Sequence, residues 1–146
     1  MNDYKKDISD SLIDLITSLN KKIFDPSEPA KRFSMPHSHV RVLFYLKKFG
    51  PVPISQVAKD LDILRSNMTP IIDKLIAEDF VRRHNDPSDR RVIKVEITNK
   101  ADELFKRHVD YLKEAISSKI SSLSNEDLSK LYELILEMAS IISKLD

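Results

Sequence analysis

The chain contains no cysteine among its 146 residues. This absence excludes disulfide bonds, thiolate metal sites and redox sensing by cysteine. No apolar run approaches the roughly 20 residues that a membrane-spanning helix needs. The N-terminal stretch MNDYKKDISDSL also lacks the apolar core of a secretory signal. We therefore expect a cytoplasmic protein without a membrane segment.

Glycine is almost as scarce, because Gly50 is the only one in the chain. Phosphate-binding loops and the nucleophile elbow of hydrolases both need several glycines, so the sequence excludes them. The metalloprotease pattern His-Glu-x-x-His is absent too, and the carboxylates are scattered over the polar faces of predicted helices. We expect neither an enzyme nor a bound cofactor.

Histidines offer a weak metal-site pattern. His37 and His39 form a His-x-His pair at the start of a predicted helix, and His108 falls in another helix. Side chains two residues apart on a helix point to different faces, so this pair is poorly arranged to share a metal ion. We expect no metal site, with a metal-responsive protein as an alternative.

The chain has little excess charge, with 24 Lys and Arg against 23 Asp and Glu. A net charge of +1 is small for a nucleic-acid-binding protein, whose affinity depends largely on neutralising phosphates. Residues 82–91 are locally basic, however. The overall charge therefore permits nucleic-acid binding without indicating it.

The most informative stretch lies between residues 55 and 98. Five apolar residues recur there at helical spacing and predict an amphipathic helix over residues 66–78: Met68, Ile71, Ile72, Leu75 and Ile76. Ser66 or Asn67 is the expected N-cap, which places Pro70 in the first turn, where its missing N–H matters least. A shorter helix capped by Ser55 precedes it. The pair is typical of a helix-turn-helix, although any small helical domain can contain such a helix.

Two strands with an arginine-rich turn are predicted to follow. The first begins within residues 80–83, and the second covers residues 92–97, where apolar and polar side chains alternate. The connecting segment HNDPSDRR is rich in turn residues. We expect Asp86 and Asp89 to pair with guanidinium groups of the hairpin, which carries Arg82, Arg83, Arg90 and Arg91. Such a hairpin faces either an anion or only solvent.

In this order and spacing, residues 36–98 resemble the DNA-binding domain of the MarR family of bacterial transcription regulators. Three segments carry the resemblance: the recognition helix LRSNMTPIIDKL with Thr69, Asp73 and Leu75, the preceding helix ISQVAKDLDI with Val57 and Ala58, and a wing signature at Asp89, Arg91 and Thr98. The resemblance implies a winged helix-turn-helix that places one helix in the DNA major groove.

Some positions depart from the family pattern. Pro70 replaces the basic residue that often follows the recognition-helix threonine, which removes one possible base or phosphate contact. Asp79 stands where glycine is usual before the wing. Lys100 and Ala101 stand where glycine usually begins the next helix.

Helices are predicted on both sides of this domain. One covers residues 3–24, and Pro26 and Pro29 mark the connection that follows. A nearly all-apolar helix over residues 34–49 would be capped by Ser34. Thr98 and Ser124 are expected to cap two further helices, over residues 98–122 and from 124 to the end. The predicted fold is mainly α with a small β-hairpin wing (α+β).

We divide the chain into an N-terminal dimerisation helix and linker (1–33), a winged helix-turn-helix DNA-binding domain (34–98) and C-terminal dimerisation helices (99–146). A small winged domain cannot bury the apolar faces of all these helices, so the surplus should pack against a second copy. The resemblance likewise implies a homodimer. A twofold dimer would bind an inverted-repeat operator with half-sites about 10 bp apart. An intramolecular bundle is the alternative.

The resemblance assigns double-stranded DNA as the partner, most plainly through Arg91 in the minor groove, oriented by Asp89. The expected DNA-contacting residues are Ser55, Gln56, Arg65, Ser66, Asn67, Thr69, Lys74, Arg83, His84, Asp89, Arg90 and Arg91. The resemblance also implies a repressor that a small aromatic or anionic ligand releases from DNA. The candidate ligand-binding residues are His37, Arg41 and Tyr45. A winged-helix adaptor that binds proteins and has no operator is the alternative from another class.

Overall fold

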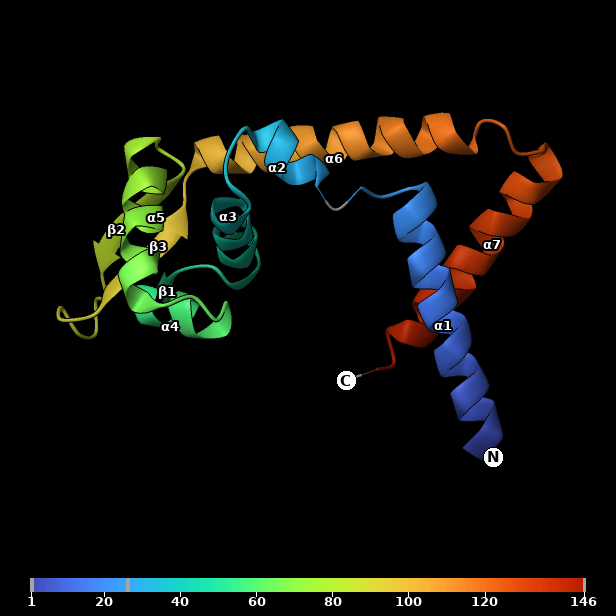
Figure 1. The fold of residues 1–146 in the computed structure, drawn as a ribbon, viewed down its shortest axis with the longest axis horizontal. Helices are drawn as coiled ribbons and strands as arrows, with labels where there is room; N and C mark the ends of the chain where they lie inside the picture. Colours follow the sequence, from blue (N-terminus) through green and yellow to red (C-terminus); the bar gives the residue numbers. More distant parts are fainter. Residues whose placement is uncertain (1, 26, 146) are drawn as a thin grey trace. The chain divides into compact units, whose positions relative to one another are not determined.

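The computed structural model describes residues 2–25 and 27–145. These residues form seven helices and three strands (Figure 1): α1 (Asn2–Lys22), α2 (Glu28–Phe33), α3 (His37–Phe49), β1 (Val52–Pro53), α4 (Ile54–Asp60), α5 (Arg65–Ala77), β2 (Val81–Asn85), β3 (Ile93–Ile97), α6 (Asn99–Ile120) and α7 (Asn125–Ile142). The chain divides into two compact units, residues 1–110 and 111–146. None of the described helices is long and apolar enough to cross a membrane.

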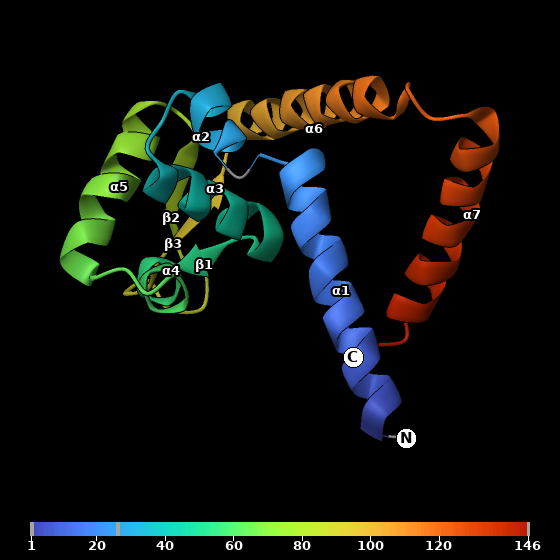
Figure 2. The same ribbon diagram turned by 45° about the vertical axis from the view of Figure 1, so that its right-hand side comes forward.

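The core of the first unit lies between α3, α4, α5 and the sheet, which Figure 2 shows gathered together. The stripe predicted for the helix over residues 66–78 supplies its centre, because Met68, Ile72 and Leu75 are fully buried. Leu43 of α3 and Val95 of β3 lie in the same core and are equally inaccessible. The sequence therefore identified the inner face of α5 correctly.

The sheet contains the predicted hairpin and one additional short strand. Its order is β1-β3-β2, and both pairs are antiparallel. Arg83 lies opposite Val95 and Asn85 opposite Ile93 in the hairpin register. The additional strand, β1, lies at the edge of the sheet and contains Pro53, which has no N–H to donate to a neighbouring strand. This mainly helical fold with a small antiparallel wing confirms the predicted fold class.

Three predicted N-caps are wrong. α3, α4 and α5 begin after Pro36, Pro53 and Leu64, and none of these residues makes a side-chain cap hydrogen bond. Each has an extended backbone, with ψ between 136° and 147°. A proline fixes φ at a value suited to entering a helix, so two of these starts need no capping hydroxyl. The expected caps Ser55 and Ser66 lie inside helices, as does Asn67.

The earlier start of α5 changes the position of Pro70. Counted from Arg65, the proline is the sixth helical residue and lies beyond the first turn. Its missing N–H therefore removes the hydrogen bond that the Ser66 carbonyl would otherwise accept within the helix. The expectation that Pro70 falls in the first turn is wrong, because α5 begins at Arg65, before the predicted caps Ser66 and Asn67.

The connection around Pro29 is also partly helical. α2 was not predicted, yet Pro29 occupies its second position, where an N–H has no helical partner in any case. Ser34 ends this short helix in a left-handed conformation, with φ of 52°, and its N–H donates to the Ala30 and Lys31 carbonyls. Ser34 is therefore a C-cap and not the expected N-cap.

Backbone conformation explains one departure from the family pattern. Asp79 has a φ of 62°, in the left-handed region that glycine adopts most readily. Aspartate tolerates this region better than most residues. The Thr98 hydroxyl donates to the Asp79 carbonyl at 2.6 Å, which holds the turn between α5 and the wing. Gly50, the C-cap of α3, likewise has a positive φ, of 70°.

Two predicted caps are confirmed at the long helices. The Thr98 hydroxyl accepts from the Ala101 N–H at 3.3 Å at the start of α6. The Ser124 hydroxyl accepts from the Asp127 N–H at 3.0 Å at the start of α7. These hydrogen bonds satisfy backbone donors that have no partner within the helix.

An aromatic cluster joins α2, α3 and the first half of α6. The Phe33 ring contacts those of Phe105 and His108, with centroids 5.8 Å and 5.2 Å away. His108 is buried, and its Nδ1 is the one buried side-chain polar atom without a hydrogen-bond partner in the part of the chain described. Burial lowers the pKa of His108; the nearby Arg32 lowers it further, and Glu28 opposes the shift.

This environment predicts a pH-dependent stability. Unfolded His108 takes up a proton as the pH falls below about 6.5, whereas the buried imidazole resists protonation. The free energy of unfolding should therefore have its full value above that pH and decrease as the pH falls below it. His108→Phe should weaken this dependence, measured by urea denaturation at about pH 7.5 and about pH 5.5.

His39 provides the comparison, because burial lowers the pKa of this second histidine as well. His39→Phe should remove a separate part of the dependence, and the double variant should lose both parts. An unchanged pH dependence in His108→Phe would contradict the assignment.

Candidate nucleic-acid interface

The outer face of α5 is the most accessible polar surface of the helix-turn-helix. Because its apolar stripe is buried, the opposite face is turned to solvent. Five residues predicted to contact DNA lie exposed on this helix: Arg65, Ser66, Asn67, Thr69 and Lys74. The Thr69 hydroxyl donates to the Arg65 carbonyl at 3.4 Å, so it is turned toward the backbone of its own helix.

α4 presents Ser55 and Gln56 to solvent, while Val57 and Ala58 are buried beneath them. The Gln56 amide donates to the Asp60 carboxylate at 2.7 Å. The same carboxylate accepts from the Tyr45 hydroxyl at 2.5 Å. These two hydrogen bonds lower the pKa of Asp60, and the bond to the carboxylate raises the pKa of Tyr45 to about 12. One of the two N–H groups of the Gln56 amide is thus used by Asp60, and the other is left to contact a phosphate.

The basic residues of the hairpin strands are largely paired. Arg82 Nε lies 2.7 Å from Glu96 Oε1, and Arg83 forms an ion pair with Asp73 of α5. His84 Nδ1 lies 3.6 Å from the same Glu96 oxygen. The Arg83–Asp73 pair connects the wing directly to the recognition helix. Neither the Arg83–Asp73 pair nor the Arg82–Glu96 pair was predicted from the sequence. The hairpin register, in which Arg82 lies opposite Glu96, would have indicated the second pair.

The expected pairing of Asp86 and Asp89 with guanidinium groups is wrong. Asp86 Oδ2 lies 2.5 Å from Lys94 Nζ, and this contact and the Ser88 N–H lower the pKa of Asp86. Asp89 accepts from the Arg91 backbone N–H at 3.0 Å. Aspartates in tight turns readily accept a hydrogen bond from a backbone N–H two residues ahead. Asp89 makes this local hydrogen bond instead of pairing with a guanidinium group. Asp89 thus shapes the loop that carries Arg91.

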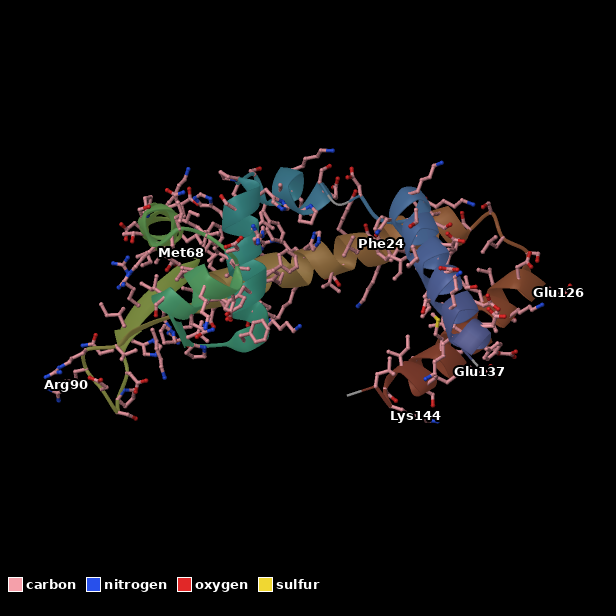
Figure 3. All side chains as sticks on the ribbon, turned by 60° about the horizontal axis from the view of Figure 1, so that its bottom comes forward. Phe24, Met68, Arg90, Glu126, Glu137 and Lys144 are labelled. Atoms are coloured by element: carbon pink, nitrogen blue, oxygen red, sulfur yellow. The ribbon has the colours of Figure 1, made fainter. Side chains whose placement is uncertain are left out.

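The tip of the wing projects from the domain. Figure 3 shows Arg90 at the end of the loop between β2 and β3, pointing away from the helices. Four exposed cations of α5 and the wing form no ion pair with any described residue: Arg65, Lys74, Arg90 and Arg91. Guanidinium and ammonium groups bind phosphates, while hydroxyl and amide side chains hydrogen-bond base edges. The helix face and the wing together have the chemistry of a DNA-binding surface.

Comparison with known proteins identifies the family. Residues 35–93, which extend from the start of α3 into the wing, match the MarR family. The chain belongs to the MarR family. Among its curated relatives are proteins of Bacillus subtilis described as HTH-type transcriptional regulators. Membership confirms the resemblance that the recognition helix and wing signature suggested.

One relative of this MarR-family chain is the HTH-type transcriptional repressor MdtR of Bacillus subtilis, 29% identical over 104 residues, or 71% of this chain and 63% of MdtR. The matched part spans between 47% and 63% of the length of three such curated relatives.

Solved structures share the fold over almost the whole chain. Transcriptional regulator Tm0710 from Thermotoga maritima has a TM-score of 0.79 at 19% identity, covering 95% of this chain and 96% of that one. A mutant of S. aureus MepR, solved bound to an oligodeoxyribonucleotide, has a TM-score of 0.66 at 17% identity, covering 92% of this chain and 97% of that one.

The three ligand candidates lie on α3 of this MarR-family chain. His37 and Arg41 are exposed and Tyr45 is half-buried, and all three share a face because they are four residues apart. Arg41 donates to the Leu61 carbonyl at 2.9 Å, and Tyr45 binds Asp60. This face therefore contacts the end of α4. Residues 2–25 and 27–145 contain no group of three or more potential ligands that could hold a metal ion.

The Arg83–Asp73 pair predicts a measurable but small coupling. Both side chains are more than one third exposed, so solvent screens the interaction. Arg83→Ala and Asp73→Ala should each lower the free energy of unfolding, and a double-mutant cycle should give a coupling of about 1 kcal/mol or less. Urea denaturation of the four proteins measures it. Strict additivity would show that the pair contributes nothing.

Proposed function

We propose that this MarR-family protein is a sequence-specific, double-stranded-DNA-binding transcription regulator that acts as a homodimer. The observation that carries the proposal is the combination of an exposed polar α5 face with a wing tip whose Arg90 and Arg91 have no ion-pair partner among the described residues. The oligodeoxyribonucleotide bound to the S. aureus MepR mutant, which has the same fold, supports it.

The contacts divide by chemistry. We assign base edges to Ser66 and Asn67, whose side chains are exposed and polar. Arg65 and Lys74, on the same helix, are assigned to the DNA backbone, and Arg65 can also bind a guanine. Arg90 and Arg91 enter the adjacent minor groove. Ser55, Gln56 and His84 are assigned to phosphates, from α4 and from the base of the wing.

Arg83 and Asp89 have a different role in this proposal. The guanidinium of Arg83 already binds Asp73, and the Asp89 carboxylate binds a backbone N–H. We assign both residues to positioning: Arg83 sets the wing against α5, and Asp89 shapes the loop beneath Arg91. Asp73 would otherwise present an unpaired carboxylate to the phosphates, and Arg83 offsets that charge.

Dimerisation is supported by apolar side chains that the single chain leaves exposed. No residue of α7 is buried, and a stripe along it is 37–49% exposed: Leu131, Ile135, Met138 and Ile142. α1 exposes Ile8, Leu12, Leu15 and Ile16 at similar spacing. Apolar stripes of this extent favour association. We assign residues 1–33 and 99–146 to dimerisation and residues 34–98 to DNA, with operator half-sites about 10 bp apart.

The proposal also includes repression and control by a small ligand. MdtR is named a repressor, and a repressor role is proposed here by analogy. A small aromatic or anionic effector at His37, Arg41 and Tyr45 would compete with the bonds that Arg41 and Tyr45 make to Leu61 and Asp60. Releasing α4 in this way would shift the helix-turn-helix and weaken operator binding.

Selection of bound sequences from a random DNA pool tests the main proposal. The wild-type protein should enrich an inverted repeat at moderate salt. Arg91→Ala should weaken binding to that operator and reduce the salt dependence of log K by about one phosphate contact. The affinity for each variant is measured by fluorescence anisotropy over a salt series.

Arg82→Ala is the matched control, because Arg82 is paired with Glu96 on the hairpin. It should leave the salt slope nearly unchanged. Recovery of no sequence above background at low salt would overturn the proposal and favour a protein-binding adaptor.

The dimer has its own test. Ile135→Glu places a charge in the exposed stripe of α7 and should convert the protein to a monomer, measured by sedimentation equilibrium. Operator affinity should fall with it, because two half-sites are no longer bound together. Ser129→Glu adds the same charge on the opposite side of α7 and should leave the dimer intact. A dimeric Ile135→Glu protein would exclude this stripe from the interface.

A further inference from the structure

The exposed face of α5 carries two small apolar groups among its polar side chains. Thr69 and Pro70 are adjacent and both exposed, while Met68 and Ile71 on either side of them are buried. Pro70 presents an aliphatic ring with no donor of its own.

The hydrogen bond of Thr69 determines which part of that side chain is available. Its hydroxyl donates to the Arg65 carbonyl at 3.4 Å, within the same helix. Serine and threonine hydroxyls satisfied in this way are turned toward their own backbone. Because Oγ1 and the γ-methyl group leave Cβ in different directions, the methyl group is the part left for a partner. The hydroxyl of Thr69 is thus already used within the helix.

We propose that the γ-methyl group of Thr69 and the ring of Pro70 are specificity-determining contacts for the 5-methyl groups of thymine in the major groove. The inference rests on the proposed function, since it requires α5 to enter that groove. The thymine methyl is the only apolar group that a base pair presents there, and small apolar side chains recognise it. Ser66 and Asn67, one turn earlier or beside them, remain free for polar base edges.

Replacing thymine by uracil tests the contact from the DNA side, since it deletes the methyl group and changes no protein atom. Each thymine of the selected operator is replaced in turn, and the dissociation constant is measured by fluorescence anisotropy. With the wild-type protein, one or two positions per half-site should weaken binding about three- to fivefold, the effect of one buried methyl group. Operator binding that is insensitive to uracil at every position would overturn the proposal.

Matched protein variants assign the sensitive positions. Thr69→Ser keeps the hydroxyl and loses the methyl group, so one position should become insensitive to uracil. Thr69→Val keeps the methyl group and loses the hydroxyl, so that sensitivity should persist. Pro70→Ser removes the ring and restores a backbone N–H; it should abolish sensitivity at a different position. Circular dichroism confirms that each variant is folded.

The outcomes distinguish a failure of the proposed methyl contacts from a failure of the proposed DNA-binding function. If Thr69→Ser and Pro70→Ser retain every uracil sensitivity of the wild type, the methyl contacts are made by other residues and this inference is wrong. If Thr69→Val loses the sensitivity and Thr69→Ser keeps it, Thr69 acts through its hydroxyl, which also overturns it. A wild-type protein that selects no DNA sequence would overturn the proposed function, and this inference with it.

Discussion

The burial of one stripe of α5 is the interaction on which the rest of this structure depends. Met68, Ile72 and Leu75 have no accessible surface, and they pack into one core with residues of α3, α4 and the sheet. A helix with a single apolar stripe has only one orientation that buries it. That orientation turns Ser66 and Thr69 outward. The exposure of Pro70 and the polar face of the helix follow from the same orientation.

Charge distribution follows from the same arrangement. The net charge of +1 suggests a poor nucleic-acid-binding protein only if it is treated as uniform. In the structure, acids pair with the cations that hold the wing together, as Glu96 does with Arg82 and Asp86 with Lys94. The cations of the wing tip and of the recognition helix remain available. The net charge of the chain therefore does not describe the local charge of this surface.

The arrangement also links the two parts of the proposed DNA-binding surface. Arg83 of β2 forms an ion pair with Asp73 of α5, so the wing and the recognition helix are linked directly. On the other side, Arg41 and Tyr45 bind the end of α4. These polar contacts lie at the periphery of the core, where solvent weakens them.

Hairpin strands, long helices and the inner face of α5 were predictable because each depends on a local period of apolar residues. The family was recognisable for a similar reason, since its recognition helix and wing signature are contiguous segments. Helix starts were less predictable. Ser34, Ser55 and Ser66 were plausible caps, yet α3, α4 and α5 begin after Pro36, Pro53 and Leu64.

The sequence by itself determined the fold class, the exposed polar face of α5 and the absence of cysteine chemistry, because periodicity and composition are local properties. Only the tertiary structure decided which charges are free. Arg83 and Arg91 look alike in the sequence, but one lies opposite Asp73 and the other stands at the tip of a loop shaped by Asp89. Likewise, only the hydrogen bond to the Arg65 carbonyl shows which half of Thr69 faces outward. Such pairings depend on distances between segments that no local pattern encodes.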